Sequence, residues 1–118
     1  MPHVVLQTPL NLDEMEKRFD LKHIEEKNVH VNYMALFHNK EKNGLLIETY
    51  VKEEPLAQRV GITIHQREDD IYVIGLSEIG FPRPTWGLQL AISECAKWLL
   101  KLEDQTHVVS QNLAADLF

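Results

Sequence analysis

The strongest pattern of apolar and polar positions lies in residues 85–103 and predicts one long helix. Gln89, Ser93, Lys97 and Lys101 recur every fourth residue and form one narrow polar stripe on a 3.6-residue repeat. The other positions are almost all apolar and cover more of the circumference than the apolar stripe of an ordinary surface helix does. We therefore expect this helix to be covered on two sides.

Four segments before this helix have the patterns of strands. They are residues 30–39, 45–52, 59–66 and 70–77, separated by short polar or Pro-containing connections. In the third segment, Val60, Ile62 and Ile64 alternate with smaller or polar residues, which indicates one buried face. Because short connections favour antiparallel neighbours, the pattern predicts a meander.

The N-terminal region predicts a shorter amphipathic helix. Asn11 is a suitable N-cap with Glu14 three residues later, and Leu12, Met15 and Phe19 form an apolar stripe that continues imperfectly towards residue 24. Residues 3–7 resemble a short edge strand. Together the patterns predict an α+β fold, with a four-stranded antiparallel meander, one long apolar helix packed on it and the N-terminal helix. We expect residues 1–118 to form a single domain.

Composition narrows the classes of partner. The 118 residues carry 18 acidic and 12 basic side chains, a formal net charge of −6, and the sequence has no long basic run. Nucleic-acid binding through phosphates is therefore not expected. No apolar run is long enough to span a membrane, and Cys95 is the only cysteine, so we expect a reducing, cytoplasmic location without a disulfide. No cofactor is expected.

The start of the long helix is the best candidate binding site. Free main-chain N–H groups at a helix N-terminus attract anions, and Arg83, Thr85 and Gly87 lie there beside the rings of Phe81 and Trp86. A carboxylate or phosphate ligand fits this chemistry. The alternative is structural: Thr85 caps the helix, Trp86 fills the core and Arg83 pairs with an acidic neighbour.

The six histidines suggest few metal sites. His30 and His38 share a strand face but are separated by about 26 Å of strand. In a meander, His38 and His65 lie at one end of the sheet, about 10 Å apart, with Asp69 in the adjoining turn. They are candidates for a metal site, and the alternative is that they are solvated turn residues.

The C-terminal segment, residues 110–118, is expected to be a packing or docking tail. Asp116, Leu117 and Phe118 resemble the end of the peptide by which bacterial replication proteins dock into the sliding clamp, although Ala114 and Ala115 depart from that pattern. The alternative is that Leu113, Leu117 and Phe118 pack on this domain.

The sequence contains no pattern typical of nucleophilic catalysis or of a phosphate-binding loop, and it predicts no catalytic residue. The first and fourth expected strands are apolar on both faces, so we expect a homodimer, or another protein partner, to cover part of the sheet. The leading hypothesis is a non-enzymatic protein-interaction or regulatory module. The alternative is a small-ligand domain or enzyme that binds an anion at the start of the long helix.

Overall fold

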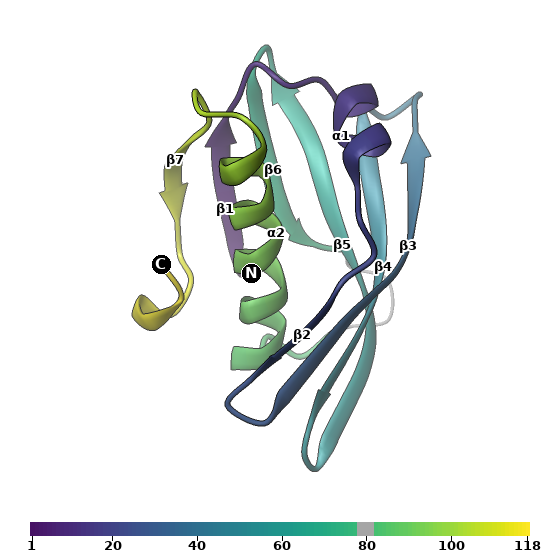
Figure 1. Cartoon of the computed structure of the whole chain (residues 1–118), viewed down its shortest axis with the longest axis vertical. Helices are drawn as coiled ribbons and strands as arrows, with labels where there is room; N and C mark the ends of the chain where they lie inside the picture. Colours follow the sequence, from purple (N-terminus) through teal and green to yellow (C-terminus); the bar gives the residue numbers. More distant parts are fainter. Residues whose placement is uncertain (78–81) are drawn as a thin grey trace.

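A computed structural model describes residues 1–77 and 82–118. Its core is a curled antiparallel sheet of seven strands in the order β2-β3-β4-β5-β6-β1-β7 (Figure 1). The strands are β1 His3–Gln7, β2 His23–Glu26, β3 Val29–Asn39, β4 Gly44–Glu53, β5 Leu56–Glu68, β6 Ile71–Leu76 and β7 His107–Gln111. The helices are α1 Leu12–Arg18, α2 Trp86–Leu102 and the short 3-10 helix η1 Ala115–Leu117.

The expectation of a four-stranded sheet is wrong, because three further strands extend the sheet into a half-barrel. Strands β3 to β6 follow one another as the short connections indicate, but β1 pairs with β6 and β7 pairs with β1. Strand β1 is therefore not at the edge, and its Val4 and Leu6 are fully buried. Five residues carry too little pattern to predict a pairing with a strand almost 70 residues away.

Strand β2 replaces the expected continuation of the first helix. Helix α1 has the predicted capping box between Asn11 and Glu14, but it ends at Arg18. Residues 23–26 then pair with β3 through a two-residue turn in which Lys27 and Asn28 have φ angles of 51° and 64°. Two positive φ angles give the turn the twist of a tight hairpin, and asparagine tolerates this conformation.

Both α-helices lie on the inner face of the curled sheet. Tyr33 of β3 donates a hydrogen bond to the main-chain oxygen of Ala91 in α2 at 2.6 Å, and His38 of the same strand faces α1. These two residues are five positions apart, which would place them on opposite faces of a regular strand. A bulge between Tyr33 and Ala35 restores the inward direction of His38.

Helix α2 begins after Thr85, its N-cap, and ends at Leu102, as the apolar pattern predicts. One side packs on the sheet, with Leu88, Ile92 and Leu99 fully buried. On another side the ring of Trp98 packs edge-on against Phe19, with 5.6 Å between the ring centroids. The chain following α1 thus provides part of the second covering. In the described part of the chain, no helix is long and apolar enough to cross a membrane.

Candidate functional site

The first turn of α2, expected to bind an external anion, holds a carboxylate of the chain itself. Glu53, the last residue of β4, accepts a hydrogen bond from the main-chain N–H of Gly87 through Oε2 at 3.1 Å. Thr85 Oγ1 accepts from the N–H of Leu88 at 3.3 Å. An external anion at Gly87 would have to displace Glu53. Phe81, also assigned to this site, lies outside the described residues.

The other two residues of the expected anion site also have partners within the chain. The main chain of Arg83 makes two hydrogen bonds with the side-chain amide of Gln58. Trp86 Nε1 donates to the carboxylate of Asp116 at 3.2 Å, and Lys27 Nζ lies 2.9 Å from that carboxylate and 5.0 Å from the Trp86 ring centroid. The hydrogen bond between Lys27 and Asp116 raises the pKa of the lysine and lowers that of the aspartate.

The C-terminal tail packs on the domain. Leu113 and Leu117 are buried in the core cluster, whereas Phe118 is 46% exposed, with Lys97 Nζ 5.8 Å from its ring centroid. Asp116, within η1, forms the contacts with Lys27 and Trp86 described above. Leu117 is therefore not available for docking elsewhere while the tail holds this position.

The histidines expected to meet at one end of the sheet face opposite sides of it. His38 pairs across the strands with Leu45, and Leu45 pairs with Ile64, so His65, the next residue, points to the outer face. His38 points inward and contacts α1, with Nδ1 3.0 Å from Glu16 Oε1 and 3.5 Å from Asp13 Oδ1.

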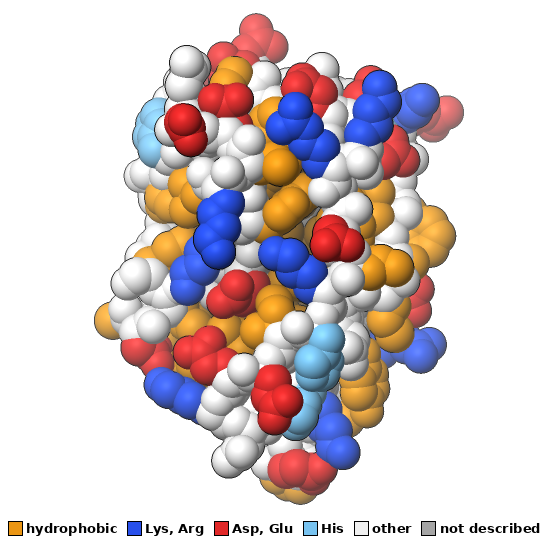
Figure 2. All heavy atoms as spheres, in the orientation of Figure 1, with side chains coloured by type: hydrophobic (Ala, Val, Ile, Leu, Met, Phe, Trp, Pro, Cys, Tyr) orange, Lys and Arg blue, Asp and Glu red, His pale blue; other side chains and the backbone are white. Residues whose placement is uncertain are grey.

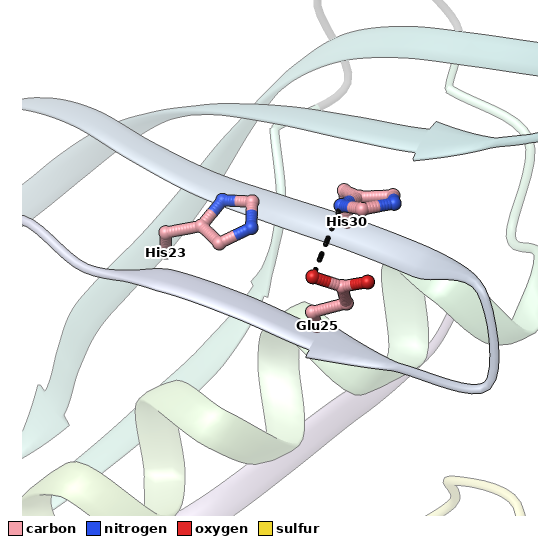
Figure 3. A group of neighbouring side chains, drawn as sticks. All are labelled: His23, Glu25 and His30. Atoms are coloured by element: carbon pink, nitrogen blue, oxygen red, sulfur yellow. Dashed lines mark ion pairs between the residues drawn. The ribbon is translucent and has the colours of Figure 1, made fainter.

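A different group of possible metal ligands lies on the hairpin of β2 and β3. His23, Glu25 and His30 offer ligand atoms that all lie within 4.8 Å of one another (Figure 3). Sequence reasoning missed this group because the residues of β2 were assigned to the end of a helix. The usable signal was the alternation of His23, Ile24 and Glu25, which places the two polar side chains on one face of a strand.

The outer face of the sheet carries a hollow of about 310 Å³. Its lining includes Phe37 of β3, Leu46 and Glu48 of β4, and Arg59 and Gly61 of β5. Phe37 is 55% exposed, unusual for a phenyl ring, and a Cβ at Gly61 would lie 2.6 Å from Leu46 Cδ1. Because residue 61 is a glycine, the Leu46 side chain can lie over it and form the apolar floor of the hollow.

The rim of this hollow is charged. Glu48 Oε1 lies 3.7 Å from Arg59 Nε, and both side chains are accessible to solvent. A second hollow of about 400 Å³ adjoins the first, with Leu46 in both linings, and extends towards Lys42 and His65. We call the two together the outer-face hollow. It combines an exposed aromatic ring, a carboxylate and several basic groups, a set that suits a flat polar ring with a phosphate attached.

Comparison with known proteins gives one informative match. The chain is 29% identical over 99 residues to a tRNA (guanine-N(7)-)-methyltransferase of Deinococcus radiodurans. The match covers 84% of this chain and 30% of that enzyme, so the chain spans less than a third of its relative's length. No family model and no solved structure matches. The similarity to an RNA-modifying enzyme contradicts the interpretation of the chain as a non-enzymatic protein-interaction or regulatory module.

Proposed function

We propose that the chain serves tRNA modification by binding an unstacked guanine base of RNA in the outer-face hollow. The similarity to a guanine-modifying tRNA methyltransferase supports the class of substrate. The observation that carries the proposal is the grouping of an exposed Phe37 ring, the Glu48 carboxylate and the side-chain-free Gly61 around one hollow.

Each of these groups has a counterpart in guanine. The Watson–Crick edge of guanine carries two adjacent N–H donors, at N1 and N2, which match the two oxygens of the Glu48 carboxylate. Proteins that bind single-stranded RNA commonly stack a base on an aromatic ring displayed by a sheet, and Phe37 offers such a ring. Arg59 and Lys42 then lie where they can contact phosphates on either side of the base.

The charge of the molecule limits the RNA interface to a few nucleotides. A net charge of −6 opposes a long contact with a phosphate backbone. On the face that carries α2, opposite the hollow, the acidic and basic side chains of the described residues are interspersed (Figure 2). We therefore assign this domain the binding of a single splayed base, and not of a duplex, within a cytoplasmic tRNA-modifying system.

Titration of the protein with mononucleotides tests this proposal. By isothermal titration calorimetry, GMP is expected to bind and AMP is not, because adenine presents an acceptor at N1 where guanine presents a donor. The 7-methylated form of GMP carries a positive ring charge and should bind more tightly than GMP, since a carboxylate and an aromatic face both favour a cation.

Variants locate the site of binding. Glu48→Gln should weaken GMP binding about tenfold or more, because it removes a charged acceptor of two hydrogen bonds. Glu54→Gln, which changes another exposed glutamate that lies outside the hollow, is the matched control. Equal binding of AMP and GMP, or an unchanged affinity in Glu48→Gln and Phe37→Ala, would show the proposal to be wrong.

A further inference from the structure

Two histidines and a glutamate converge on the outer side of the β2–β3 hairpin, away from the outer-face hollow (Figure 3). Glu25 of β2 is paired directly with His30 of β3, and His23 is paired with Asn32. His23 and His30 are therefore diagonal neighbours, and their ring centroids are 5.6 Å apart. Because Ile24 and Val31 turn towards the core, the three polar side chains share the opposite face.

Strand pairing holds the backbone around these three residues in place. The hairpin keeps four paired positions in register, from His23 opposite Asn32 to Glu26 opposite Val29. The side chains remain adjustable, since 62% of the Glu25 side chain and 38% of the His30 side chain are accessible. Ligands of a tetrahedral zinc ion lie about 3.3 Å apart. Rotation of these exposed side chains can close the present spacing of at most 4.8 Å to that distance.

One of the two imidazoles is already oriented as in a metal site. Asn32 Oδ1 lies 2.6 Å from Nδ1 of His23 and accepts its N–H, so the lone pair is left on Nε2. Metal-binding histidines usually donate their other ring N–H to an oxygen in this way, which fixes the tautomer and the direction of the ring.

The charges around the hairpin permit a cation. Lys52 of β4 is paired with His30 across the strands, but its Nζ lies 3.2 Å from Glu54 Oε1, which offsets its charge. Glu26 also lies on β2, on the same face as Ile24, and the whole chain carries a net charge of −6. Two imidazoles with one carboxylate form a donor set that favours zinc and other divalent transition metals over calcium or magnesium.

We propose that His23, Glu25 and His30 bind one divalent transition-metal ion, with Zn²⁺ as the best fit and water in the fourth position. Bound in this way, the ion joins the edge strand β2 to β3. The site is independent of the proposed guanine binding, because none of its three residues lines the outer-face hollow.

Titration of the tag-free protein with ZnCl₂ at pH 7.5 tests this proposal. Isothermal titration calorimetry should give one ion per chain, and Co²⁺ should give the visible absorption of a four-coordinate site. His23→Ala and His30→Ala should each weaken Zn²⁺ binding by at least about tenfold, and Asn32→Ala by about tenfold through loss of ring orientation. The variants should keep the circular dichroism of the parent, because His23 is exposed and His30 and Asn32 are only partly buried.

The second histidine–carboxylate group supplies the matched control. His38 lies beside Asp13 and Glu16, and it offers one nitrogen ligand against two carboxylates. His38→Gln is expected to leave Zn²⁺ affinity unchanged. Loss of binding in His38→Gln with retention in His23→Ala would place the ion at the other group and overturn the proposal. Absence of saturable Zn²⁺ binding to the parent protein would also overturn it.

Discussion

Glu53 joins the end of β4 to the start of α2, and its substitution should show how much this contact stabilises the fold. Its Oε2 accepts the N–H of Gly87 at 3.1 Å, near the positive end of the helix dipole. Its Oε1 is buried and has no hydrogen-bond partner among the described residues. A Cβ at Gly87 would lie 2.7 Å from Oε1, so the carboxylate fits closely against the helix.

Two substitutions separate the contributions of charge and hydrogen bond. Glu53→Gln keeps the shape and an acceptor but loses the favourable charge at the helix end, which costs about 1 kcal/mol. Glu53→Ala also leaves the N–H of Gly87 without its partner, for a total of about 2 kcal/mol after the gain from removing the unpaired Oε1. For a chain of this length the melting temperature should fall by about 4 °C in the first variant and about 8 °C in the second.

Urea unfolding followed by tryptophan fluorescence, together with calorimetric melting, measures these changes. Glu54→Ala is the control, because Glu54 is exposed and its pair with Lys52 is expected to contribute less than about 0.5 kcal/mol. Phosphate should stabilise Glu53→Ala more than the parent, since it can occupy the vacated helix N-terminus. If Glu53→Ala unfolds at the same urea concentration as the parent, or if phosphate stabilises both equally, the reasoning is refuted.

Three further predictions concern single side chains. Tyr33→Phe removes a buried hydrogen bond of 2.6 Å to α2 and should cost about 1 kcal/mol in urea unfolding, and an unchanged midpoint would contradict this. Burial raises the pKa of the Cys95 thiol to about 12, so the thiol should react with a disulfide reagent at pH 8 only in denaturant. Because the unfolded thiol ionises at lower pH, the folded state should also lose stability as the pH rises above about 9, and less so in Cys95→Ala. The hydrogen bonds from Lys27 and Trp86 lower the pKa of Asp116, so their stabilisation is present above the ordinary aspartate pKa and is lost as the pH falls through the lowered value. The indole N–H resonance of Trp86 should follow this titration and should not shift in Asp116→Asn, whereas titration at the ordinary aspartate pKa would contradict the assignment.

Local signals in the sequence determined the helices well. The capping box at Asn11 and Glu14 forms as expected, and Thr85 caps α2. These features depend on residues three or four positions apart, so a short window of sequence contains the whole interaction. The apolar residues of α2 cover more than one side of the helix, which likewise indicated a second covering layer. Phe19 provides part of that layer.

The candidate sites depended more on distant contacts. Free N–H groups at the start of α2 were expected from sequence, but Glu53, 34 residues before Gly87, already occupies that position. The face on which each β3 side chain lies could also not be predicted from sequence. The bulge near Tyr33 turns His38 to the inner face, whereas His65 of β5 lies on the outer face. A bulge depends on the pairing of two strands and leaves little trace in either one. The expected homodimer stays a prediction, which sedimentation can test.

The sequence by itself determined where the chain is apolar, where its two α-helices begin and that β3 to β6 follow one another through short turns. Only the tertiary structure decided that β1 lies between β6 and β7, and that β2 forms a hairpin with β3. Only the pairing of these strands brings His23, Glu25 and His30 together, and the neighbouring strands shape the hollow around Gly61. The physical reason is that helix signals are local, whereas strand neighbours are selected by the combined burial of segments far apart in the chain.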